Sequence, residues 1–188
     1  MLTHYIDIHL RPDPEFPVSL LMPALYAKLH RALVQLACSD VGVSFPGYSG
    51  RPLGLGSCLR LLGQPDRLNQ LMAQPWLSAM TDHVATSTIC AVPADAAHRR
   101  LCRVQARSSP ERLRRRQMKR HGLTDAQAQE RIPDSAAQTL QLPFLPLRSA
   151  STGQSFLLFL RLSPAQSTPV TGAFNAYGLS PTATIPWF

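Results

Sequence analysis

The sequence lacks the spaced ligand motifs that enzymes use to bind metal ions. Its four cysteines, Cys38, Cys58, Cys90 and Cys102, form no CxxC pair, so they do not make a zinc motif. No Asp or Glu follows Asp134, and magnesium sites need carboxylates. These absences argue against a zinc enzyme and against a two-metal nuclease. They predict reduced, mostly buried thiols and no metal or other cofactor.

Two kinds of targeting or binding segment are also missing. The N-terminal sequence MLTHYIDIHLRPDPEF mixes apolar and charged residues, unlike a signal peptide or a membrane span, so we expect a cytoplasmic protein. The glycine-rich segment GYSGRPLGLGS lacks a GKS or GKT ending and is no phosphate-binding loop. The 17 prolines divide the 188 residues into short segments, which favours a compact mixed fold with many loops.

Positive charge, by contrast, is abundant and concentrated in one stretch. Ten of the 19 Lys and Arg residues lie between Arg99 and Arg120, where Glu111 is the only acid. A solvated protein surface normally mixes both signs, because opposite charges at helical spacing stabilise each other. A helix that lies on a membrane would need an aromatic and leucine-rich face, which this stretch lacks. The charge therefore favours a nucleic acid as partner.

Hydrophobic periodicity predicts an α+β fold whose first domain, residues 1–95, is ferredoxin-like. Residues 4–10 alternate like a half-buried strand, and residues 18–38 carry leucines at helical spacing. The other elements are predicted at 41–45 (strand), 58–62 (strand), after Asp66 (short helix) and near 85–92 (strand). This βαββαβ order is typical of a fold in which helices cover one face of an antiparallel sheet.

A second, basic domain is predicted over residues 96–188. Residues 99–107 alternate so that Arg103 and Gln105 lie on the same face of a strand. The sequence Ser-Pro-Glu at 109–111 is a good helix start and Gly122 a natural stop, which predicts an arginine-rich helix over about 109–121.

Within this predicted helix, only Leu113 and Met118 are available to anchor it to the rest of the protein. Charged side chains surround most of its axis, so the helix would gain order from phosphates. Thr124 and Gln127 predict a capping box for a further short helix that ends near Pro133.

An RNA chain can be cut without a metal ion, since the ribose 2′-hydroxyl can attack the neighbouring phosphate. The protein must then orient that hydroxyl, accept its proton and stabilise the phosphate charge. Histidine suits the proton transfer near neutral pH, and serine, tyrosine and backbone amides suit the other tasks. A histidine beside an apolar helical face, such as His30, is by itself more often structural. His4, His9, His83 and His98 are assigned to structure or surface.

Several segments, taken together, carry a resemblance to a known family. They run in order as HYIDIHLRPDPEFP, KLHRAL, RVQARSSPERLRRRQMKRH, RIPD, LPFLPLRSASTGQSF, YGLS and PWF, with weaker similarity at 47–57, 81–98 and 163–172. They resemble the type I-F CRISPR repeat-processing endoribonuclease. The resemblance implies the ferredoxin-like domain and a divergent second domain that bears the arginine-rich helix.

The activity that this resemblance implies is metal-independent cleavage of a CRISPR repeat transcript at the base of its hairpin. The products would carry a 2′,3′-cyclic phosphate and a 5′-hydroxyl. The enzyme would act once, stay bound to the mature guide RNA and join other subunits of a type I-F surveillance complex.

The resemblance also implies catalytic roles for four residues. The family's catalytic histidine corresponds to His30 in KLHRAL, and its active-site tyrosine to Tyr177 in YGLS. The serine that positions the attacking 2′-hydroxyl corresponds to Ser149 in RSASTGQ, with Ser151 close by. Without the resemblance, Ser149 would be taken for a turn former and Tyr177 for a core residue with a satisfied hydroxyl.

RNA contacts are implied in the same way. Arg103 would read a guanine and Gln105 an adenine, as their side-chain geometry allows, and Phe156 would stack on the closing base pair of the hairpin. The helix residues similar to the family's groove-inserting set are Arg112, Arg115, Arg116, Lys119, Arg120 and His121. The family pattern has arginine at the position of Lys119, so a bidentate contact of a guanidinium would be replaced there by the single point charge of an ammonium group. Because the major groove of A-form RNA is deep and narrow, we expect the helix to enter near a loop or an end.

Two other functions stay open at this point. The protein could be a subunit that only caps the guide hairpin and does not cut it, although His30 and Ser149 favour an enzyme. It could also bind double-stranded DNA, which would require a similar affinity for a DNA duplex and an RNA stem.

Overall fold

The computed structural model describes residues 1–105, 110–133, 140–150 and 152–188, and the chain forms two compact units. The first unit contains Met1–Val104 and Leu142–Phe188, and the second contains Gln105–Gln141. The two compact units have other bounds than the domains expected at 1–95 and 96–188, and those domains stay a prediction.

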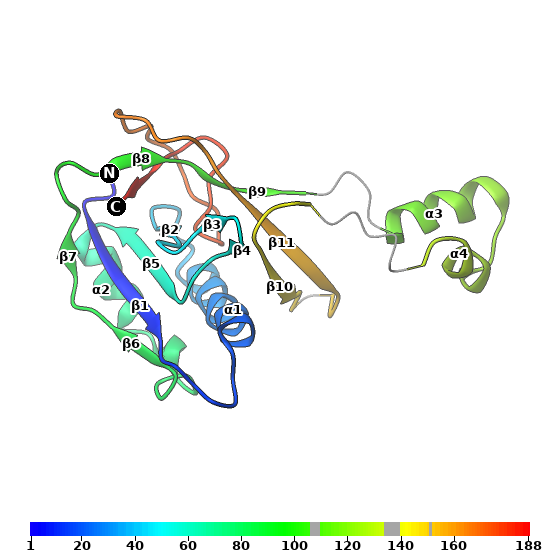
Figure 1. Ribbon diagram of the computed structural model, residues 1–188, viewed down its shortest axis with the longest axis horizontal. Helices are drawn as coiled ribbons and strands as arrows, with labels where there is room; N and C mark the ends of the chain where they lie inside the picture. Colours follow the sequence, from blue (N-terminus) through cyan, green and yellow to red (C-terminus); the bar gives the residue numbers. More distant parts are fainter. Residues whose placement is uncertain (106–109, 134–139, 151) are drawn as a thin grey trace. The chain divides into compact units, whose positions relative to one another are not determined.

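The first unit is built around an antiparallel sheet with two helices (Figure 1). Its elements are β1 (His4–Leu10), α1 (Val18–Leu36), β2 (Gly42–Ser44), β5 (Cys58–Gly63), α2 (Pro65–Met72), β6 (Val84–Thr86) and β7 (Cys90–Ala91). The strand order is β2-β5-β1-β6, and β7 also pairs with β1. The helices α1 and α2 contact each other and β1, and lie on one face of the sheet.

The sequence pattern explains this packing. Ile6, Ile8 and Leu10 are buried, as the alternation in residues 4–10 predicts. The apolar stripe of α1 is buried against them through Leu21, Leu25, Leu29 and other residues at helical spacing. The helix ends at Leu36, two residues short of the predicted end, and Ala37 after it has a left-handed backbone.

Three smaller sheets complete the first unit. β10 (Phe144–Arg148), β11 (Ser155–Leu162) and β9 (Leu101–Val104) form an antiparallel sheet in the order β10-β11-β9, and β10 lies against α1. The others are the pair β8 (Ala97–Arg99) with β12 (Ile185–Trp187) and the hairpin β3 (Ser49–Gly50) with β4 (Leu53–Gly54). A 3₁₀ turn, η1 (Pro75–Leu77), follows α2.

The second unit contains α3 (Pro110–His121) and α4 (Asp125–Arg131), which contact each other. Gly122 has φ 61° and donates its N–H to Met118 O at 2.8 Å, so it ends α3 as predicted. The predicted capping box is confirmed, because Thr124 and Gln127 exchange hydrogen bonds at the start of α4. Among the described residues, no helix has the length and apolar character needed to cross a membrane.

Two sequence-based strand predictions were wrong in extent. The strand expected near 85–92 is divided into β6 and β7, because Thr86 pairs with Ile8 and Cys90 with Tyr5, so one extra residue between them interrupts the pairing with β1. The strand expected over 99–107 is interrupted at Arg100, and β9 ends at Val104. Pairing of β9 with β11 stops at Val104, opposite Phe159, although β11 itself continues to Ser155. Residues 106 and 107 of the predicted strand lie outside the described residues.

Candidate functional site

The first unit has a cavity of about 260 Å³ whose walls come from distant parts of the sequence. One wall is α1, another is the end of β10 with the turn after it, and Phe156 of β11 and Tyr177 complete it. The lining residues are Ala27, His30, Arg31, Leu147, Arg148, Ser149, Ala150, Phe156 and Tyr177. Four residues singled out from the sequence, His30, Ser149, Phe156 and Tyr177, therefore lie together.

The imidazole of His30 is held by two contacts. Its Nδ1 lies 2.8 Å from the carbonyl oxygen of Ala176, and its ring stacks on that of Tyr177 with centroids 3.9 Å apart and planes 1° apart. Since a carbonyl oxygen can only accept, Nδ1 must carry a proton and donate it. In the neutral ring the lone pair is therefore on Nε2, which is the nitrogen left for proton transfer.

The segment that carries Tyr177 is itself fixed by several hydrogen bonds. Tyr26 donates its hydroxyl to the carbonyl of Tyr177 at 2.6 Å, and burial raises the pKa of Tyr26, which keeps this hydroxyl protonated. The side-chain oxygen of Asn175 accepts the N–H groups of Tyr177 at 2.8 Å and Leu179 at 3.2 Å. These bonds fix the ring of Tyr177 against His30.

Gly178 allows this segment to approach β2 closely. It has φ 67°, and a β-carbon added at this position would lie 2.5 Å from Cγ1 of Val43. Val43 also donates its N–H to the carbonyl of Gly178 at 3.0 Å. Sequence reasoning missed Tyr26 and Asn175, which carry no local signal, whereas the glycine in YGLS is a signal that could have been used.

Ser149 begins a tight turn between β10 and β11. Its N–H donates to Gln154 O at 2.8 Å, and its own carbonyl accepts from Gly153 N–H at 2.9 Å. Its hydroxyl accepts from Thr152 N–H at 3.3 Å, while Nε of Arg148 donates to Gly153 O at 2.9 Å. Ser149 is thus both a turn former and a wall of the cavity. Ser151 lies outside the described residues.

Arg103 and Phe156 lie on one face of the sheet β10-β11-β9. Arg103 is opposite Leu160 in the β9–β11 pair, and its guanidinium lies 5.4 Å from the centroid of the Phe156 ring. Contact of this kind is a weak cation–π attraction. Gln105 is exposed and follows β9 in the other unit, so the shared face predicted for Arg103 and Gln105 stays a prediction.

The exposed side of α3 is basic. Arg115, Arg116, Lys119, Arg120 and His121 are exposed, and none of the ion pairs found among the described residues involves them. The side chain of Arg112 lies outside the described part.

The opposite side of α3 is held by more than the two predicted anchors. Leu113 and Met118 are half-buried, as expected, but Arg114 also turns inward and donates Nε to Ile132 O at 2.7 Å. The prediction that only Leu113 and Met118 anchor the helix was therefore wrong, because Arg114 is also held by a backbone carbonyl.

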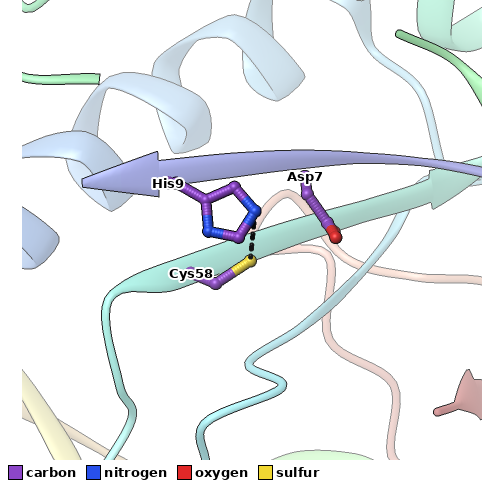
Figure 2. A group of neighbouring side chains, drawn as sticks. All are labelled: Asp7, His9 and Cys58. Carbon is purple, nitrogen blue, oxygen red and sulfur yellow. Dashed lines mark hydrogen bonds between the residues drawn. The ribbon is translucent and has the colours of Figure 1, made fainter. Parts of the chain in front are cut away.

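One group of side chains outside the cavity has metal-binding atoms near each other (Figure 2). Ligand atoms of Asp7, His9 and Cys58 lie within 4.8 Å of one another, with His9 Nε2 4.0 Å from Cys58 Sγ. However, Nε and Nη2 of Arg60 donate to the two carboxylate oxygens of Asp7 at 2.7 and 2.8 Å.

The thiol of this group is partly shielded from solvent. Burial, together with the nearby Asp7 carboxylate, raises the pKa of Cys58 to about 12, so without a metal ion the thiol stays protonated near neutral pH. The fixed positive charge of Arg60 opposes a second cation beside Asp7. Asp7 is thus engaged by Arg60, while Cys58 is buried and His9 is exposed.

Comparison with known proteins agrees with the sequence motifs. A family model described as "CRISPR-associated protein (Cas_Csy4)" matches residues 5–188. The chain is 49% identical over 187 residues to the CRISPR-associated endonuclease Cas6/Csy4 of Pseudomonas aeruginosa (strain UCBPP-PA14), with 100% of both chains covered. It is 45% identical over 187 residues to the protein of that name from Escherichia coli (strain UTI89 / UPEC), again with 100% of both covered. The chain therefore belongs to the Csy4 family of CRISPR-associated proteins, and the resemblance to the type I-F repeat-processing enzymes is confirmed.

Proposed function

We propose that the protein is an endoribonuclease that cuts CRISPR repeat transcripts at the base of the repeat hairpin. The observation that carries this proposal is the cavity that His30, Ser149 and Tyr177 line together. Relatives over the full length of the chain are named endonucleases, which supports the same activity.

In the proposed reaction the 2′-hydroxyl attacks its neighbouring phosphate, and the bond from phosphorus to the 5′-oxygen breaks. His30 takes up the proton of the 2′-hydroxyl at Nε2, because Nδ1 is occupied by the carbonyl of Ala176. The 5′-oxygen takes a proton from water as it leaves, and His30 returns its own proton to the solvent. The products are a 2′,3′-cyclic phosphate and a 5′-hydroxyl, and no metal ion takes part.

Ser149 and Tyr177 serve the same step in different ways. The hydroxyl of Ser149 positions the 2′-hydroxyl, and hydrogen bonds between Ser149 and the residues Thr152, Gly153 and Gln154 fix its place. Ser151, which lies outside the described residues, has an assisting role in this proposal. Tyr177 keeps the imidazole in one plane by stacking on it at 3.9 Å. A preorganised ring and hydroxyl reduce the reorganisation needed at the moment of reaction.

We further propose that the hairpin is held mainly by α3 and by three residues near its base. Arg112, Arg115, Arg116, Lys119, Arg120 and His121 bind the groove and its phosphates, which supports tight retention of the product as guide RNA. Arg103 and Gln105 read bases, and Phe156 stacks on the closing pair. With its product bound, the protein acts as a subunit of a type I-F surveillance complex.

We infer a ferredoxin-like arrangement for residues 1–95, joined to a divergent RNA-binding domain over 96–188. The order β2-β5-β1-β6 supports this, since α1 connects β1 to β2 across β5 and α2 connects β5 to β6 across β1. Helix α1 packs on this sheet and carries His30.

The test compares a repeat hairpin RNA with the same RNA that carries one 2′-deoxy group at the cut nucleotide, both with a chelator. We expect cutting of the first and binding without cutting of the second. Cutting that needs magnesium would reject the mechanism, and equal affinity for an unstructured RNA of the same length would reject hairpin recognition. Tight binding with no cutting of either RNA would support the alternative of a non-cleaving subunit.

A further inference from the structure

Arg31 lines the same cavity as His30, Ser149 and Tyr177, but it takes no part in the steps proposed for those residues. Ala27, His30 and Arg31 are spaced by three and four residues along α1, so their side chains share one face of the helix. The small side chain of Ala27 leaves this part of the wall open. A substrate that meets His30 therefore also lies within reach of the long side chain of Arg31.

The guanidinium of Arg31 has no protein partner in the described part of the chain. Arg31 is exposed, and the ion pairs found there join Arg60 with Asp7, Arg67 with Asp40 and His83 with Asp13. Another cation of the same helix is used differently: Nζ of Lys28 donates to the carbonyl of Ser78 at 2.7 Å. Lys28 thus serves the fold, whereas Arg31 is available to a ligand.

The charge of the cavity fits an anion. Its described lining includes Arg31 and Arg148 and contains no Asp or Glu. Nε of Arg148 is already used by the carbonyl of Gly153, so Arg148 holds the turn of Ser149. The planar fork of the other guanidinium, on Arg31, matches two oxygens of a phosphodiester.

We propose that Arg31 binds the phosphate that is cut and stabilises the charge that develops there. This inference rests on the proposed function. When the 2′-oxygen attacks and its proton passes to His30, the phosphodiester changes from one negative charge to two, until the 5′-oxygen leaves. A fixed cation at this phosphate stabilises the transition state more than the substrate.

The test uses three variants with the same hairpin RNA. Single-turnover cutting at saturating protein measures the reaction, and the Kd for the 2′-deoxy RNA measures binding. For Arg31→Gln we expect cutting to slow by about 10- to 100-fold, since an exposed cation contributes less than a buried oxyanion donor, and the Kd to rise by less than about threefold. Arg31→Lys should recover part of the rate, because it restores the charge without the fork.

The matched control is Arg11→Gln, which removes the same charge from an exposed arginine that does not line the cavity. It should leave both the rate and the Kd unchanged. If the wild type cuts the hairpin and Arg31→Gln cuts it at the same rate, the inference about Arg31 is wrong, while the proposed function still stands. A Kd that rises as much as the rate falls would also overturn it, because Arg31 would then act only in binding. A wild-type protein that cuts no hairpin would overturn both this inference and the proposed function.

Discussion

The close approach of Gly178 to Val43 predicts a large loss of stability for Gly178→Ala. The left-handed backbone at φ 67° costs an alanine about 1 kcal/mol. The new β-carbon would lie 2.5 Å from Cγ1 of Val43, a fully buried β-branched side chain that cannot easily change rotamer, which adds about 1–3 kcal/mol. The free energy of unfolding should thus fall by about 2–4 kcal/mol, and Tm by about 5–15 °C for a chain of this size.

The control for this prediction is Gly153→Ala. Gly153 has a similar φ of 68°, but its added β-carbon would meet only Nη2 of Arg148 at 3.7 Å, an ordinary contact. Its unfolding free energy should fall by only about 1 kcal/mol. Thermal unfolding followed by circular dichroism measures both variants. An equal loss in the two would refute the reasoning that packing of Gly178 against β2 fixes the segment beside His30.

Three further predictions concern single residues. His30→Ala should slow single-turnover cutting by about 100- to 10,000-fold while the Kd for the 2′-deoxy RNA stays near that of the wild type, and an equal loss of binding would contradict its role. Arg116→Ala should weaken binding and reduce the slope of log Kd against log salt by about one, measured by titration at several salt concentrations; an unchanged slope would mean that Arg116 touches no phosphate. Cys58 has a pKa raised from 9.0 to about 12, so its contribution to stability is present below pH 9.0 and is lost as pH rises toward 12. Urea unfolding should show a difference between the wild type and Cys58→Ala that is constant below pH 9 and shrinks above it, whereas a difference that grows would contradict this sign.

Much of the first unit could be predicted from the sequence, because its core follows simple periods. Ile6, Ile8 and Leu10 alternate along β1, and the leucines of α1 repeat at helical spacing. Strand ends were less predictable, since β9 ends where its pairing with β11 ends and alternation of residue types continues.

The candidate site depended on a different kind of information. His30, Ser149 and Tyr177 are far apart in the sequence, and only the family motifs indicated that they belong together. Contacts between residues far apart in the sequence leave no local pattern. Examples are the hydrogen bonds from Tyr26 to the carbonyl of Tyr177 and from Arg114 to the carbonyl of Ile132. The position of Arg31 at the cavity likewise became visible only in three dimensions.

The hydrogen bond between His30 and the carbonyl of Ala176 has a consequence for the order of events in the cell. The ribosome makes α1 long before it makes Ala176, so a growing chain contains the histidine well before the group that orients it. Under the proposed function, a partly synthesised molecule would carry α3 but would lack an aligned imidazole. RNA binding would then precede cutting until the residues around Ala176 had been made.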